Sequence, residues 1–141
     1  MKVSERVLRL ILWLLALDAA IGSAVLLAGG RAVFIRLYSY APASEVSDLL
    51  LFKQRQWGAL GVALAIMLIA AARDPRRHSV IVWAMAAGLA TAGIAELSSI
   101  WLVSDARLFP MSSFVVHALA RIGIVLVLVY LEKRVLADRK V

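Results

Sequence analysis

Four long apolar runs constrain this chain more than any other feature of its sequence. They cover about residues 7–28, 55–72, 80–103 and 112–131. Most are close to the ~20 residues that a helix needs to cross a bilayer. A segment in lipid must satisfy its backbone groups internally, so we expect each run to be a helix. The sequence therefore predicts one all-α membrane domain over 1–141, a bundle of four transmembrane helices.

Helix-stopping segments separate the runs. A Gly-Gly pair follows the first run, and the segment 73–77 (RDPRR) ends the second, because neither its charges nor its proline suits a membrane helix. Ser4 is the expected N-cap of the first helix. The second helix starts near residue 55, or earlier if Ser47 precedes it. Within residues 31–54, a short amphipathic stretch predicts an interfacial helix in the first outer loop.

The cationic residues are distributed unevenly between the two sides of the predicted bundle. Four crossings place both termini and the second connection on one side, with ten cations against five on the other. By the positive-inside rule, we expect both termini in the cytoplasm. The ten are Lys2, Arg6, Arg9, Arg73, Arg76, Arg77, Lys133, Arg134, Arg139 and Lys140, and the five are Arg31, Arg36, Lys53, Arg55 and Arg107.

Composition excludes several classes of function. Hydrophobic residues make up 63% of the chain and charged residues 18%, against about 45–50% and 25% in soluble domains. The net charge of +7 is explained by topology, so no nucleic acid is expected as a partner. The absence of cysteine removes thiolate metal sites and cysteine nucleophiles. His78 and His117 lie near opposite membrane faces, so neither a bis-histidine haem nor a metal site is expected.

Two stripes of small residues predict close helix packing. Small side chains at every fourth position let membrane helices approach closely, where van der Waals contact drives association. Such stripes favour a tight bundle. They are Ala16, Ala20, Ala24 and Ala28 in the first helix, and Ala84, Gly88 and Ala92 in the third.

Ionisable residues at membrane depth are the main candidates for function. Each costs about 2.5–3.5 kcal/mol near a helix centre, so we expect such residues to face the bundle interior with partners. Counting from the outer helix ends at ~1.5 Å per residue puts Glu96 and Arg121 at one level, with Asp18 and His117 close by. This predicts a polar, outward-opening cavity with a Glu96–Arg121 ion pair at its floor and Asp18 and His117 in its wall.

Three further residues are candidates for the same cavity. Ser99 shares the helical face of Glu96, and Arg55 and Trp57 lie at the outer mouth of the second helix. Trp57 is either an interfacial anchor, like the other tryptophans, or part of a ligand site.

Structural interpretations stand beside the functional ones. In the structural interpretation, Glu96 and Arg121 serve only to join the third and fourth helices, because an arginine in lipid requires a carboxylate. Asp18 must then be protonated, reach Arg55 or meet His117. A protonated aspartate could exchange protons, which is one way such residues serve transport.

Enzyme signatures are missing from the sequence. There is no G-x-S-x-G, H-E-x-x-H, Walker-type or dinucleotide-binding motif. Asp18, Glu96 and His117 could act as acids and bases, but nothing selects a reaction. A non-enzymatic role is therefore favoured, with no catalytic residue and no cofactor predicted. A quinone is the one cofactor-like molecule that the cavity would suit.

The segment 55–61 (RQWGALG) opens the second helix after a long first outer connection. With the four short helices, it resembles small bacterial membrane proteins of the DoxX-like kind. The resemblance implies a bacterial inner-membrane subunit or binding protein, and some members are linked to quinone-dependent oxidation or redox complexes. His117 and Arg121 depart from it, so no functional residue is carried over. Small multidrug-resistance exporters share the length and an acid resembling Asp18, but the charge bias disagrees with their mixed orientation.

Three hypotheses of function follow. The first is an inner-membrane protein that binds a small amphiphile, lipid-like or quinone-like, or a partner subunit through the outer polar cavity. The second is an oligomeric proton-coupled transporter that uses Asp18. The third is a membrane anchor or assembly subunit in which the Glu96–Arg121 pair is structural. The expected partners are the lipid bilayer, further copies of the chain or a larger membrane complex.

Overall fold

The computed structural model describes residues 3–37, 47–102 and 111–137, and every regular element in these ranges is an α-helix. Four of the helices are long and apolar enough to cross a membrane, which confirms the predicted all-α architecture with four candidate spans. The helices are α1 (Val3–Ala28), α2 (Arg31–Leu37), α3 (Asp48–Arg73), α4 (Ser79–Leu102) and α5 (Met111–Ala137). The short α2 lies in the first connection, where the sequence predicts a helix.

Helix α3 begins about two turns before the apolar run that identifies it. Ser47 is its N-cap, since the Ser47 hydroxyl accepts a hydrogen bond from the backbone N–H of Leu50 at 3.2 Å. The predicted start near residue 55 is therefore wrong, and the earlier start after Ser47 is correct. A serine cap satisfies the first backbone donors and lets the helix begin in a polar segment.

Helices α1 and α5 also extend beyond their apolar runs. Helix α1 starts at Val3, so Ser4 lies inside it and is not its N-cap. Helix α5 continues to Ala137 rather than ending near residue 131. Its last turns are held because Leu131 and Val135 are buried in the core.

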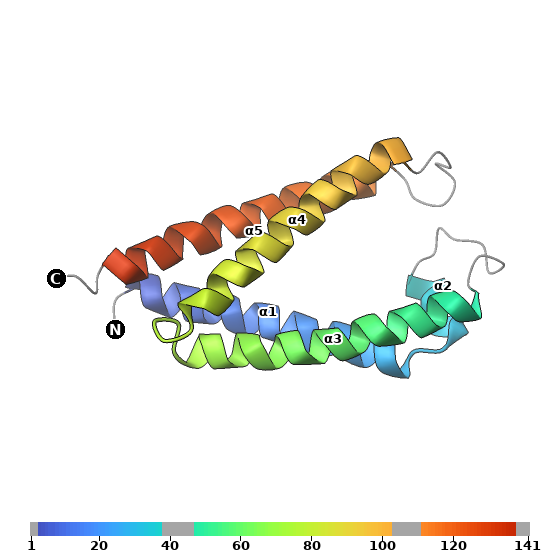
Figure 1. Cartoon of the computed structure of the whole chain (residues 1–141), viewed down its shortest axis with the longest axis horizontal. Helices are drawn as coiled ribbons and strands as arrows, with labels where there is room; N and C mark the ends of the chain where they lie inside the picture. The colour runs from blue at the N-terminus through green and yellow to red at the C-terminus, as the bar shows by residue number, and fades with distance from the viewer. Residues whose placement is uncertain (1–2, 38–46, 103–110, 138–141) are drawn as a thin grey trace.

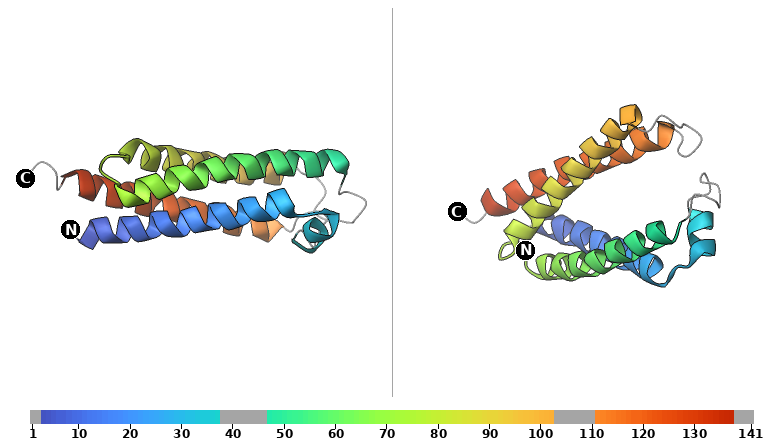
Figure 2. Two further views of the ribbon diagram at one scale, coloured as in Figure 1. Left: turned by 90° about the horizontal axis from the view of Figure 1, so that it is seen from below. Right: turned by 45° about the vertical axis from the view of Figure 1, so that its right-hand side comes forward.

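The long helices form two antiparallel pairs, α1 with α3 and α4 with α5 (Figure 1). The pairs meet at the end of the molecule that carries Val3, Ala137 and the α3–α4 turn, which we call the closed end. They diverge toward the opposite end, near α2, which we call the open end (Figure 2). The structure is therefore a wedge of two helix pairs, and not the evenly packed bundle expected from the small-residue stripes.

The hydrophobic core lies toward the closed end and joins the two pairs. Its fully buried side chains come from all four long helices. Elsewhere the outer surfaces carry many exposed large apolar side chains, as lipid-facing surfaces do. The core comprises Leu8, Leu12, Ala16, Leu68, Ala71, Ala72, Val82, Leu128, Leu131 and Val135.

Two glycines of α3 permit its close approach to α1. A Cβ added at Gly58 would lie 3.0 Å from Cβ of Leu26, and one added at Gly61 would collide with the hydroxyl of Ser23. That hydroxyl is already fixed, because it donates a hydrogen bond to the carbonyl of Ala19 at 2.5 Å. Both glycines belong to the segment 55–61, so the described structure gives this segment a packing role.

We predict that Gly61→Leu destabilises the protein, because the new side chain would force α3 away from α1. The expected loss is about 1–3 kcal/mol, typical of overpacking. Unfolding in increasing dodecyl sulfate, followed by circular dichroism, measures it. The matched control is Gly22→Leu, since a Cβ at Gly22 meets no atom within 4 Å. Equal stability of the two variants would contradict the close α1–α3 contact.

Candidate functional site

An apolar groove of about 580 Å³ lies between the two helix pairs. We call it the central groove. Its lining combines two residues of α3, seven of α4 and one arginine of α5. These residues are Leu64 and Met67, then Val80, Ile81, Ala84, Met85, Gly88, Leu89 and Ala92, and finally Arg121.

Small residues of α4 provide the space of the central groove. Ala84, Gly88 and Ala92 follow one another on one helical face, and each lines the groove. The sequence suggested that this stripe packs against another helix, but the structure opens a groove over it. On α1, only Ala16 of the other stripe is buried, while Ala20, Ala24 and Ala28 are exposed. Because the two helix pairs are widely separated here, the small residues of α4 form the floor of a groove and do not pack against another helix.

Glu96 and Arg121 form an ion pair between α4 and α5. Nη1 of Arg121 lies 2.5 Å from Oε1 of Glu96, and the two side chains are 34% and 20% exposed. The two helices are in ordinary van der Waals contact here, since a Cβ added at Gly93 would lie 3.9 Å from Cβ of Arg121. Among the described residues, the other Glu96 oxygen is buried without a hydrogen-bond partner.

The ion pair bounds the central groove on its open-end side. From Ala92, next to the pair, the groove extends along α4 to Val80 at the closed end, about three helical turns away. The expected cavity had the pair at its floor and opened outward. The described groove runs in the opposite direction from the pair, through the apolar half of the molecule, and has one charged end.

Asp18 and His117 lie on the two sides of the wedge. Ile11 of α1 and Ile124 of α5 line a second cavity of about 370 Å³, together with Ala120, Gly123 and Val127. Asp18 and His117 each lie two turns from these isoleucines, toward the open end and on the same helical faces. Both are exposed, and no hydrogen bond or ion pair joins either to any part of the chain that the structure describes. The expectation of an inward-facing, partnered Asp18 is not met there.

Two further sequence candidates, Arg55 and Trp57, do not line these two cavities. Arg55 is exposed, and Trp57 is 64% exposed on the outer surface of α3, as an interfacial anchor would be. The side chain of Ser99 lies outside the described residues. Within the described ranges, no group of three or more His, Asp or Glu residues could hold a metal ion.

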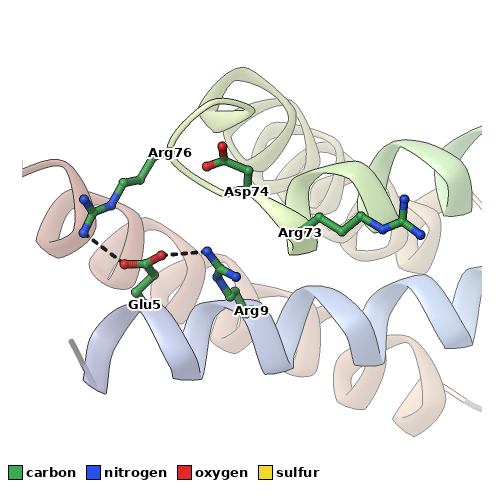
Figure 3. A pocket seen from close by; sticks show the side chains of 5 residues that line it. All are labelled: Glu5, Arg9, Arg73, Asp74 and Arg76. Carbon is green, nitrogen blue, oxygen red and sulfur yellow. Dashed lines mark hydrogen bonds and ion pairs between the residues drawn. The ribbon is translucent and has the colours of Figure 1, made fainter. Parts of the chain in front are cut away.

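Sequence reasoning overlooked a charged cluster at the closed end, shown in Figure 3. Glu5 is 6% exposed, and its two carboxylate oxygens accept hydrogen bonds from Arg9 at 2.8 Å and Arg76 at 2.9 Å. The sequence interpretation counted both arginines among the topology signals and connected neither of them with Glu5. The i,i+4 spacing of Glu5 and Arg9 was the available clue. Nothing local in the sequence indicated that Arg76, far along the chain, would join them.

A second carboxylate at the closed end is also buried. Glu132 is fully buried among core residues of α5, and neither of its oxygens has a hydrogen-bond partner among the described residues. The sequence places Glu132 just beyond the fourth apolar run, which was expected to end near residue 131. The extension of α5 to Ala137 carries it into the core instead.

No family model, curated protein or solved structure matches this chain. The resemblance to DoxX-like proteins therefore stays a prediction.

We predict that removing one partner of the Glu96–Arg121 pair destabilises the protein more than removing both. Glu96→Gln leaves an arginine without its carboxylate at membrane depth, at a cost of about 2.5–3.5 kcal/mol. Adding Arg121→Met to this variant removes the unpaired charge and should restore most of the loss. A double-mutant cycle of unfolding free energies measures the effect. Additive losses would show that the two side chains do not stabilise each other.

Proposed function

We propose that this chain is a multi-pass membrane protein that binds a small amphiphile, lipid-like or quinone-like, in the central groove. The apolar part of the ligand lies along α4, and its polar head lies at Arg121. The groove carries this proposal, because it is apolar along its length and has a guanidinium at one end. Its volume of about 580 Å³ is within the ~300–1,000 Å³ that is usual for small-molecule sites.

The hydrogen-bonding capacity of Arg121 supports its proposed contact with the polar head of the ligand. One terminal nitrogen pairs with Glu96, while a guanidinium has five N–H donors in a planar fork. Arg121 therefore has the capacity to donate to a ligand oxygen while it remains paired. Glu96 lowers the cost of placing the charge in lipid and leaves the site close to neutral. This favours a polar or weakly acidic head, such as a quinone carbonyl or a carboxyl group.

The charge bias of the sequence supports one orientation for this proposal. We place the closed end in the cytoplasm, because most of the cations lie there, and the chain in a bacterial inner membrane. The central groove then lies mainly in the inner leaflet, below the Glu96–Arg121 pair. The polar cavity expected in the outer leaflet is replaced in this proposal by a groove that an amphiphile enters from the lipid phase.

We predict that Gly88→Leu blocks the central groove without disturbing the fold. A Cβ at Gly88 meets no atom within 4 Å, so the new side chain fits and extends into the groove. The probe is dodecanoic acid with a diazirine on its chain, and labelled peptides are identified by mass spectrometry. Displacing about two methylenes, at ~0.8 kcal/mol each, should weaken labelling of α4 roughly tenfold.

Gly22→Leu is the matched control for this labelling, because Gly22 is equally open and lies outside the groove. Ubiquinone-1 is added as a competitor to test whether a quinone uses the same site. Undiminished labelling of α4 in Gly88→Leu would contradict the groove as the binding site. The membrane-anchor hypothesis would then be favoured.

A proton-coupled transporter is the second candidate, and the placement of Asp18 and His117 favours it. Both are ionisable, exposed and unpartnered within the described chain, on opposite sides of the wedge. Movement of the two helix pairs about the closed end would bring them together. A pair of this kind could take up a proton in one state and release it in the other.

We predict that Asp18→Cys and His117→Cys become cross-linked in one molecule if the wedge closes. The chain has no cysteine of its own, so a thiol-specific reagent such as bis-maleimidoethane acts only at the introduced pair. Ile11→Cys with Ile124→Cys is the positive control, since these residues line one cavity. Cross-linking of the control alone, in liposomes at every pH tested, would exclude closure and with it the transporter hypothesis.

A further inference from the structure

The polarity of the central groove is opposite to that of a lipid leaflet. A leaflet has its polar heads at the surface and its apolar chains inside. The one charged residue in the lining of the groove is Arg121, which lies in the middle third of α5, inside a candidate span. The other end of the groove is at Val80, the second residue of the candidate span Ser79–Ser98 and therefore close to a membrane surface.

An amphiphile with only one polar end does not fit this groove in either direction. If its head lies at the surface, its terminal methyl group lies at Arg121 and leaves N–H groups of the guanidinium without an acceptor. If its head lies at Arg121, its chain ends at the level of the lipid heads, where Val80 is 77% exposed. Part of the gain from burying the chain is then lost. A chain that is polar at both ends satisfies both ends of the groove.

The length of the groove sets the distance between the two polar groups. Val80 and Ala92 both line it, so at ~1.5 Å per residue it extends about 18 Å along α4. An extended hydrocarbon chain advances about 1.25 Å per bond, given a C–C length of ~1.52 Å and an angle of ~111°. The groove therefore matches roughly 14 bonds, which is a chain of about twelve carbons with an oxygen at each end. Because its floor is a single row of small residues, we expect one chain.

The charges near the two ends of the groove differ, and they distinguish the two polar groups. At the interior end, Glu96 already neutralises Arg121, so an uncharged oxygen is favoured over an anion. At the surface end, the segment 73–77 just before α4 contains three arginines and one aspartate, Asp74 (Figure 3). Cations at this level of a membrane attract anions. A carboxylate is therefore favoured at the surface end.

We propose that the ligand of the central groove is a single-chain carboxylic acid with a hydroxyl or carbonyl oxygen near the far end of its chain. The carboxylate lies at the membrane surface near Val80, and the chain lies over Ala84 and Gly88. The distant oxygen accepts a hydrogen bond from Arg121. The ligand thus keeps the orientation that a lipid has in its leaflet. This inference rests on the proposed amphiphile binding and narrows the class of ligand.

The test uses two isomers of hydroxydodecanoic acid, which compete with the diazirine-labelled dodecanoic acid for the full chain in vesicles of dioleoyl-phosphatidylcholine. The ω-isomer has its hydroxyl at the far end of the chain, whereas the α-isomer has it next to the carboxyl group. The two isomers have the same atoms and the same charge. We expect the ω-isomer to prevent labelling of α4 at about tenfold lower concentration, because only its hydroxyl reaches Arg121 and a hydrogen bond to a charged group has this strength.

The matched variant combines Glu96→Gln with Arg121→Met, which removes the guanidinium and leaves the small residues of α4 unchanged. The two isomers should compete equally in this variant. Equal competition in the unaltered protein would overturn the inference while amphiphile binding in the groove still stands. A preference for the ω-isomer that persists in the variant would also overturn it, since the hydroxyl would then not act through Arg121. Absence of labelling in α4 would contradict the proposed function and this inference together.

Discussion

The hydrophobic core at the closed end is the contact on which the rest of the structure depends. Leu8, Leu68 and Leu128, from three different helices, are fully buried there. Each helix pair is held together along its length, but the two pairs join only toward this end (Figure 1). The space between them therefore widens with distance from the core. Both the central groove and the separation of Asp18 from His117 follow from this single joint.

Charge is placed in this fold in three different ways. Glu96 and Arg121 neutralise each other beside the groove, and Glu5 joins two arginines across the closed end. Glu132, by contrast, is fully buried without a described partner. A buried carboxylate without a partner carries a desolvation penalty. Glu132 therefore lowers the stability of the core that joins the two helix pairs. The closed end is thus both the mechanical joint and the most highly charged region of the interior.

The sequence predicted the elements well and their arrangement poorly. Hydropathy located four spans, because a membrane helix needs a long apolar run whatever its neighbours are. Counting residues from the outer helix ends placed Glu96 and Arg121 at the same depth, and in the structure they form an ion pair. The angle between the helix pairs was beyond reach, because it depends on packing between residues far apart in sequence. For that reason the stripe at Ala84 and Gly88 was assigned to a helix contact, and Arg76 was not connected to Glu5.

The divergence of the helix pairs can be measured directly by double electron–electron resonance, which gives the distance between two spin labels on the protein in nanodiscs. One labelled pair is Val7→Cys with Tyr130→Cys near the closed end, and the other is Ile21→Cys with Val116→Cys, about four turns toward the open end on nearly the same faces. All four side chains are exposed, and the chain has no other cysteine. The wedge predicts a clearly longer distance for the second pair. Equal distances would mean parallel helices and would contradict the account.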